Sequence, residues 1–331
     1  MARVPTSLAV VLITLAAALP VPAPEARAVE VVLRDVAPDR IERQRAFAAG
    51  TLELADTPDL SRLAVRLADK GLTLGSAVFL RIFKEESELE VWMQRGDRYI
   101  HFATYPICFW SGALGPKLSE GDKQTPEGVY TVTRRQLHRS GRWPRSLNIG
   151  FPNGFDRQNQ RTGSYILVHG GCSSVGCYAM TDAVVKEVFQ LTSRALTGRT
   201  QRTIQVHAFP FRMTDANMAR HRDSPWREFW SDLKIAHDIF ERTHVPPQAG
   251  VCRKRYVFAE ASARQALDMR LRSVQPARQD SRPQLARASA SAGDALSCPP
   301  ARGLEVHVDA ETNSDTDREA RHQAIDPVLF R

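Results

Sequence analysis

The chain has 331 residues, a formal net charge of +8 and a hydrophobic content of 43%, which is enough apolar material for a sizeable core. Its basic residues are not interleaved with aromatic ones as in nucleic-acid-binding surfaces, which excludes nucleic acid as a partner. After residue 28 no segment approaches the roughly 20 apolar residues of a membrane-spanning helix, so the mature chain is not expected to cross a membrane.

The first residues, 1–28, have the pattern of a secretory signal peptide. Arg3 precedes an apolar run from Leu8 to Leu19, and Ala26-Arg27-Ala28 offers a small-residue cleavage site. We expect export across the inner membrane to the periplasm, with an uncleaved N-terminal anchor as the alternative. In an exported protein the basic excess favours an acidic partner such as a cell-wall polymer or anionic lipid, although an arginine-rich average composition explains it equally well.

Residues 29–71 predict lead-in helices. The first lies around Ile41 to Ala49, and the second spans Asp59 to Lys70, where apolar residues recur on one face and Gly71 follows as a stop.

Residues 72–260 predict one mainly β domain with flanking helices, of the α+β class. The first two β-rich runs flank a short polar stretch and predict a hairpin. The long connections 111–127 and 136–162 are expected to carry function. The predicted strands are Ala77 to Phe83, Leu89 to Met93, Tyr99 to Tyr105, Gly128 to Thr133, Tyr165 to Val168 and Thr203 to His207.

Helical patterns occupy two later segments. Asp182 opens one that continues to Leu196, and aromatic and aliphatic residues from Trp226 to Phe240 predict a helix packed on the domain. Tyr256 to Phe258 is expected to be a closing strand. Residues 261–331 are poor in aromatic residues and predict a disordered tail.

The segment from His169 to Cys177 carries the clearest chemical signal. A thiol is a good nucleophile only when ionised, and a nearby histidine can hold the thiolate. Here His169 ends an apolar run, Cys177 follows after a glycine-rich turn, and a helix begins shortly afterwards. This spacing predicts a strand-loop-helix unit with Cys177 as nucleophile and His169 as proton donor and acceptor.

The other cysteines leave alternatives open. An odd count of five requires at least one unpaired thiol in an oxidising compartment, and the spacing does not indicate a disulfide framework. Cys108 is expected to pack in the core. Cys172 is expected to be a small buried residue, with a disulfide to Cys177 as the alternative, and Cys252 and Cys298 could pair. Cys172, Cys177 and His169 have no clear second pair of zinc ligands nearby, so a metal site is not expected. Nor does the sequence imply an organic cofactor.

The motif Ser174-Val175-Gly176-Cys177, preceded by His169-Gly170, resembles the catalytic signature of the L,D-transpeptidase (YkuD-type) family of bacterial cell walls. Residues 121–130, 148–153, 161–163 and 209–214 are similar to its murein transpeptidase-like branch, which includes an amidase that releases a wall-linked lipoprotein. The resemblance implies a β-sandwich and an acyl-enzyme formed on peptidoglycan stem peptides, at the L-centre carbonyl of diaminopimelate. The acyl group would then pass to an amine, giving cross-links, or to water.

The signature also departs from the common family form. The gap between histidine and cysteine is short, Val175 replaces a second histidine, and Tyr178-Ala179-Met180 stands where the family has an arginine. The short form matches the amidase-containing branch. Hydrolytic release of a wall-attached lipoprotein therefore remains an alternative to cross-linking, and a non-catalytic wall-binding module is a third.

Further residues complete the expected site. Ser174 is predicted either to hydrogen-bond within the site or to satisfy the backbone of the turn. Gly176 suits a turn with open backbone angles, with nearby N–H groups stabilising an oxyanion. The expected substrate-binding residues are Arg212, Arg161 and Tyr178, although structural ion pairs explain the two arginines equally well, and Lys123 shares that ambiguity. His101 and His207 are expected to be structural.

Overall fold

The computed structural model describes residues 38–52, 54, 56–198 and 201–261. The expected signal at 1–28 and the expected tail beyond residue 261 lie outside the described residues. Within the described ranges, no helix has the length and apolar character that crossing a membrane requires.

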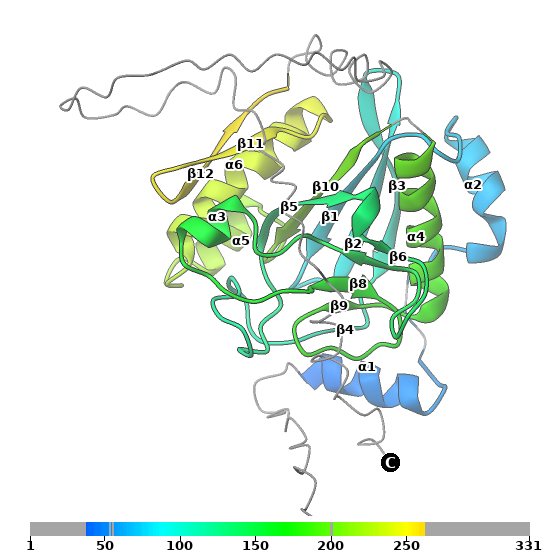
Figure 1. Ribbon diagram of the computed structural model, residues 1–331, viewed down its shortest axis with the longest axis horizontal. Coiled ribbons are helices and arrows are strands. Elements are labelled where there is room, and N and C mark those ends of the chain that lie inside the picture. Colours follow the sequence, from blue (N-terminus) through cyan, green and yellow to red (C-terminus); the bar gives the residue numbers. More distant parts are fainter. Residues whose placement is uncertain (1–37, 53, 55, 199–200, 262–331) are drawn as a thin grey trace, which may run out of the picture. The chain divides into compact units, whose positions relative to one another are not determined.

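A five-stranded mixed sheet forms the larger layer (Figure 1). Its two central strands, β1 and β10, run parallel, and all other neighbours are antiparallel. The predicted hairpin is confirmed by the pairing of β1 with β2. In spatial order the strands are β3 (Arg98–Pro106), β2 (Glu88–Arg95), β1 (Val78–Phe83), β10 (Thr203–Phe209) and β5 (Gly128–Thr133).

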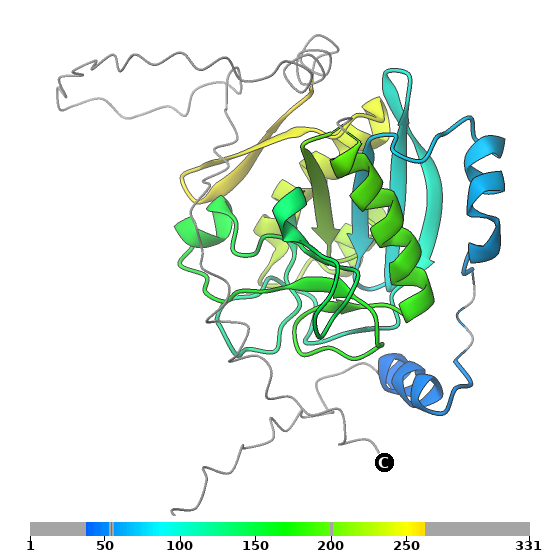
Figure 2. The same cartoon turned by 45° about the vertical axis from the view of Figure 1, so that its right-hand side comes forward.

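Both faces of this sheet are covered, which explains why β1 is apolar almost throughout and fully buried. Leu80 and Ile82 face the main core with α4 (Asp182–Thr197), whereas Phe79 packs on Phe240 of α6 (Arg227–Thr243) on the other face. Figure 2 shows α4 lying across the front of the sheet. The prediction that the aromatic-rich helix packs on the domain is confirmed.

The second layer is a small five-stranded sheet built from strands of two or three residues. Strands β8 and β9 are parallel, and the other pairs are antiparallel. Helix α4 contacts strands of both sheets, so one apolar helix face joins the two layers. In order the strands are β4 (Phe109–Trp110), β9 (Tyr178–Ala179), β8 (Leu167–His169), β7 (Ser146–Asn148) and β6 (Leu137–His138).

The remaining elements are short, and both lead-in helices are confirmed. The class predicted from the sequence, mainly β with flanking helices (α+β), is confirmed, and the structure shows that the strands form two mixed sheets. The other elements are α1 (Pro38–Ala48), the 3-10 turn η2 (Leu60–Arg62), α2 (Leu63–Asp69), η3 (Arg134–Gln136), α3 (Gly154–Gln158), α5 (Asp215–Arg220), and the hairpin of β11 (Gln248–Cys252) and β12 (Arg255–Ala259).

Candidate active site

The connection between β8 and β9 carries the predicted site. Parallel neighbours usually need a crossover of about a dozen residues or more, yet residues 170–177 join these two strands directly. The loop achieves this through left-handed backbone at Gly171, Cys172 and Gly176, with φ of 86°, 48° and 130°. The expectation that Gly176 needs open backbone angles is confirmed.

Cys177 stands at the start of β9, one position before the pairing of Val168 with Tyr178. Its sulfur accepts a hydrogen bond from the Leu167 backbone N–H at 3.3 Å. The residue is partly exposed, but burial of its thiol raises the pKa to about 11, against small opposing effects of the Leu167 N–H and the Lys117 charge. The thiol is therefore neutral at neutral pH, rather than the thiolate that the sequence predicted.

Two hydroxyl groups fix the backbone on which the thiol sits. Ser174 Oγ donates to the Cys177 carbonyl oxygen at 2.7 Å, and Thr125 Oγ1 donates to the same oxygen at 3.2 Å. The Gly176 N–H donates to Ser174 Oγ at 3.1 Å. Ser174 thus satisfies the turn backbone within the site, and the Gly176 N–H predicted for an oxyanion already has an acceptor.

His169 ends β8 and is 2% exposed. Its Nδ1 lies 2.5 Å from the Gly170 carbonyl oxygen, so Nδ1 carries the proton and Nε2 is the free acceptor. Burial lowers its pKa to about 4, although the Gly170 carbonyl and the Asp182 charge oppose this. The Trp143 ring covers the imidazole with a centroid separation of 4.3 Å.

The imidazole and the thiol are on neighbouring strands but are not hydrogen-bonded to each other in the described structure. His169 pairs with Ala179, which lies two residues after Cys177. The side chains of His169 and Cys177 therefore lie on the same face of the sheet, with Cα atoms roughly 8 Å apart. Catalytic hydrogen bonds are often long in free enzymes and shorten on substrate binding. The predicted proton transfer between the two stays a prediction.

Lys117 is a charged group at the site that the sequence did not single out. It is 5% exposed, and its Nζ bonds to Asp122 Oδ1 at 2.5 Å and to the Ser119 carbonyl at 2.9 Å. Its positive charge favours the Cys177 thiolate. No spacing or composition signal marks this lysine, because it reaches the thiol only through the folding of the loop 111–127.

A buried ion pair anchors the same loop. Lys84 Nζ donates to Glu127 at 2.9 Å and to the carbonyls of Ala113, Gly115 and Thr125, and both charged side chains are completely buried. A lysine placed in this way satisfies a loop backbone that would otherwise lack partners. It therefore positions Thr125 against the Cys177 carbonyl.

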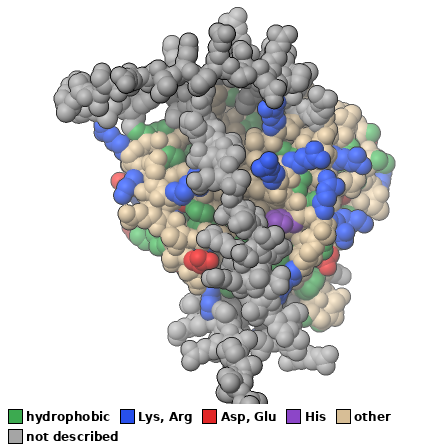
Figure 3. All heavy atoms as spheres, in the orientation of Figure 1, with side chains coloured by type: hydrophobic (Ala, Val, Ile, Leu, Met, Phe, Trp, Pro, Cys, Tyr) green, Lys and Arg blue, Asp and Glu red, His purple; other side chains and the backbone are tan. Residues whose placement is uncertain are grey.

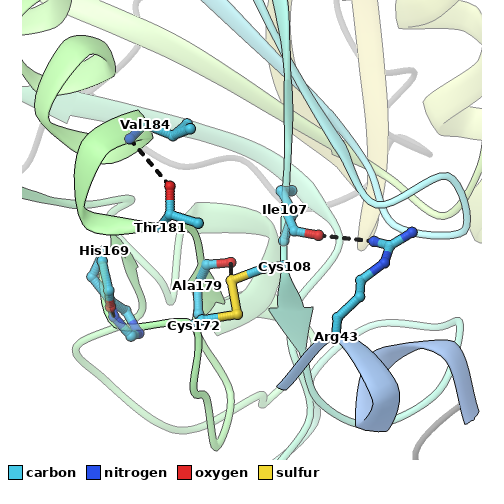
Figure 4. Close-up of a disulfide and its surroundings, with 9 residues drawn as sticks. Arg43, Ile107, Cys108, His169, Cys172, Ala179, Thr181 and Val184 are labelled. Carbon is cyan, nitrogen blue, oxygen red and sulfur yellow. Dashed lines mark hydrogen bonds between the residues drawn. A yellow bond between two sulfur atoms is a disulfide. The ribbon is translucent and has the colours of Figure 1, made fainter. Parts of the chain in front are cut away.

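A disulfide joins Cys108 to Cys172, with Cα atoms 5.4 Å apart (Figure 4). It fastens the loop 170–177 to the residue that precedes β4. Cys108 is fully buried in the core, as expected, but it is also disulfide-bonded, because the fold brings together two cysteines that are 64 positions apart. This bond also removes Cys172 as a partner for Cys177, which is the free cysteine of the described residues. Cys252 is disulfide-bonded as well, whereas Cys298 lies outside the described residues.

The expected substrate-binding side chains are already engaged. Arg212 pairs with Glu88 and Glu90, and Arg161 pairs with the buried Asp156 at 3.0 Å. These are the structural ion pairs that the sequence left open. Tyr178 is buried and donates its hydroxyl to the Pro126 carbonyl, so its side chain supports the loop instead of facing a substrate.

Other predictions near the site have clear outcomes. His207 is buried and bonds to Gln205, and His101 bonds to Thr104, which confirms their structural role. Lys123 has a left-handed backbone with φ of 55°, and the hydrogen bond to the Cys177 sulfur comes from Leu167 and not from Lys123. Among the described residues, no group of three or more potential metal ligands comes together.

Two mixed sheets, with a histidine that ends one strand and a free cysteine on the connection to its parallel neighbour, form the architecture of an L,D-transpeptidase-type domain. The chain belongs to the L,D-transpeptidase (YkuD) catalytic domain family, whose sequence model matches residues 80–228. It is 44% identical over 200 residues to YafK of Escherichia coli K12, a candidate L,D-transpeptidase, covering 60% of this chain and 81% of YafK. The YafK of E. coli O157:H7 matches equally.

Two solved structures are more distantly similar. The helical cell shape determining protein Pgp2 of Campylobacter jejuni is 16% identical, with a TM-score of 0.33, and the match covers 56% of this chain and 79% of that one. Bd1075 of Bdellovibrio bacteriovorus is 19% identical, with a TM-score of 0.28 over 50% of this chain and 60% of that one.

Proposed function

We propose that this protein is an exported cysteine enzyme that forms an acyl-enzyme on peptidoglycan stem peptides, at the L-centre carbonyl of diaminopimelate. The observation that carries the proposal is the position of Cys177, the free cysteine of the described residues, at the start of β9 in a chain of the L,D-transpeptidase family. No metal or organic cofactor takes part in the proposed reaction.

The neutral thiol and neutral imidazole set the order of proton movements. As the Cys177 sulfur attacks the carbonyl carbon, its proton passes to Nε2 of His169, which the Nδ1 bond to Gly170 keeps unprotonated. The carbonyl oxygen becomes an oxyanion, for which we assign the backbone N–H of Cys177 as donor. The C–N bond then breaks, the amine leaves with the proton from His169, and a thioester to Cys177 remains.

The second half-reaction decides between two outcomes. An incoming amine from another stem peptide would attack the thioester and produce a cross-link, whereas water would produce hydrolysis. Hydrolysis is the second candidate, because the short gap between His169 and Cys177, with Val175 inside it, resembles the amidase-containing branch of the family. In that case the enzyme would release a wall-attached lipoprotein.

Muropeptide profiling by mass spectrometry tests the proposal. Purified sacculi, with and without attached lipoprotein, are incubated with the wild-type protein and with Cys177→Ala. New cross-links between diaminopimelate residues support transpeptidation, and loss of the lipoprotein remnant supports hydrolysis. Identical profiles for wild type and Cys177→Ala would refute both and leave a wall-binding module, which should still co-sediment with sacculi.

We further propose that the protein acts in the periplasm after cleavage of residues 1–28, with a catalytic domain at 72–260. The Cys108–Cys172 disulfide supports an oxidising compartment, because such bonds are rare in the cytosol. N-terminal sequencing of the protein from a periplasmic extract tests the cleavage. A chain that still begins at Met1 in that extract would contradict it.

A further inference from the structure

A basic hollow of about 520 Å³ lies between α4 and the connection from β5 to β7. Five of its lining residues are cationic and none is acidic. All five are exposed. The cations are Arg134, Arg139, Arg145, Lys186 and Arg194, and the other lining residues are Phe189, Gln190, Ser193 and Thr197.

These five cations have no ion pair with any described residue, in contrast to arginines elsewhere on the protein. Arg212, Arg161 and Arg255, for example, each pair with a carboxylate. Like charges that gather around one hollow repel each other, and a bound anion would relieve that repulsion. The hollow, named here the basic groove, therefore has the electrostatic character of an anion site.

The basic groove starts beside the candidate active site. Lys186 lies one helical turn after Asp182, whose charge affects the pKa of His169. Gln190 and Arg194 follow Lys186 at intervals of four residues and so line the same side of α4. From Lys186 to Thr197 it extends about 16 Å along α4. The opposite wall includes Arg145, two residues after the Trp143 ring that covers His169. Figure 3 shows Lys and Arg side chains gathered on this face, over α4 and β6.

We infer that the basic groove is a second substrate subsite, which holds the carboxylates of stem peptides next to the one attached to Cys177. This inference rests on the proposed function. Guanidinium groups match carboxylates in bidentate geometry, and Gln190, Ser193 and Thr197 add hydrogen-bonding groups between the charges. A bilayer surface fits less well, because none of the exposed large apolar side chains lines the groove.

Binding is tested without turnover, in the Cys177→Ala background. The groove variant combines Arg139→Gln, Lys186→Gln and Arg194→Gln. A single exposed charge pair contributes little to binding, so the variant removes three positive charges together. We expect it to bind sacculi about tenfold more weakly than its parent, and the difference between the two proteins should shrink at high salt. The matched control removes the same charge at exposed positions outside the groove: Arg62→Gln, Arg98→Gln and Arg227→Gln. It should bind like the parent.

Activity assays with proteins that retain Cys177 separate this inference from the proposed function. We expect the groove variant to process a soluble fragment with a single stem peptide as the wild type does, but to process intact sacculi about tenfold more slowly. Equal binding and activity of the groove and control variants, or equal losses in both, would overturn the inference. Failure of the wild type on both substrates would instead refute the proposed function, and the binding arm would still report on the groove.

Competition identifies the chemistry of the ligand. Poly-L-glutamate should displace the Cys177→Ala protein from sacculi, and it should do so less effectively with the groove variant. Displacement by inorganic phosphate or by vesicles of anionic phospholipid, without displacement by poly-L-glutamate, would overturn the assignment to carboxylates.

Discussion

The electrostatic environment of the thiol is the central feature at the scale of single residues. Burial raises the pKa of Cys177 to about 11 and lowers that of His169 to about 4, so neither group is charged at neutral pH in the free protein. A neutral pair protects the thiol from oxidation and stray electrophiles, because the thiolate is the reactive form. The substrate must then trigger the proton transfer.

We predict that Cys177 in the free protein is alkylated slowly at neutral pH. With a pKa of about 11, only roughly one thiol in ten thousand is ionised at pH 7, so the rate with iodoacetamide should keep rising up to at least pH 10. Mass spectrometry of the alkylated peptide, without reductant so that the disulfides stay intact, measures this rate. A plateau between pH 6 and 7 would instead reveal a thiolate held by protonated His169.

The chemically distinctive residues of this site could be predicted from the sequence, but their supporting contacts could not. His169, Cys177 and Gly176 lie in one short segment, where residue type and spacing carry the signal. Thr125 and Lys117 come from a loop some fifty positions earlier, and only the folded chain brings them to the thiol. The carboxylate partners of Arg161 and Arg212 could not be predicted for the same reason, because tertiary packing sets which acidic residues lie beside them.

At the scale of elements, long periodic segments could be predicted and short strands could not. The strands of the large sheet are recognisable as apolar β-rich runs, and helices α4 and α6 have helical apolar patterns; both reflect local burial. In contrast, β4, β6, β7 and β9 have two or three residues each, too few for a pattern. Their stability comes from pairing with neighbouring strands, which for β4 and β9 lie far apart in the sequence, and β9 follows directly on the loop 170–177.

We predict that the Cys108–Cys172 disulfide, which ties the loop 170–177 to the residue before β4, is a main source of stability. The variant Cys108→Ala/Cys172→Ala leaves no new free thiol, and a link across 64 positions corresponds to about 4 kcal/mol of lost chain entropy in the unfolded state. Urea denaturation should show a lower midpoint than the wild type. Because the loop carries Cys177, muropeptide turnover should fall as well.

The result that would contradict this prediction is an unchanged midpoint and unchanged turnover. Ser174→Ala is a useful comparison, since it removes one hydroxyl from the same loop and leaves the disulfide intact. It should lower turnover while changing the urea midpoint much less.

At the scale of the whole molecule, the described residues include more histidines whose pKa is lowered by burial than carboxyl groups whose pKa is raised by it. Burial lowers the pKa of His101, His169, His207 and His237. Below about pH 6.5 these histidines bind protons more readily in the unfolded chain than in the folded protein. Protonation therefore favours unfolding, and the protein loses stability as the pH falls. Asp156, whose pKa burial raises to about 6, acts in the opposite direction, as does Glu86.

We therefore predict that the melting temperature falls between pH 7 and pH 4, and that His207 accounts for part of the fall. Burial lowers its pKa to about 3, and its ring packs against that of Phe79 with a centroid separation of 4.7 Å. His207→Phe keeps an aromatic ring in this cluster but cannot be protonated. Differential scanning calorimetry should show a smaller difference in melting temperature between the two pH values for this variant than for the wild type. Parallel curves for the two proteins would mean that protonation of His207 does not limit acid stability, and that the loss arises at the other buried groups.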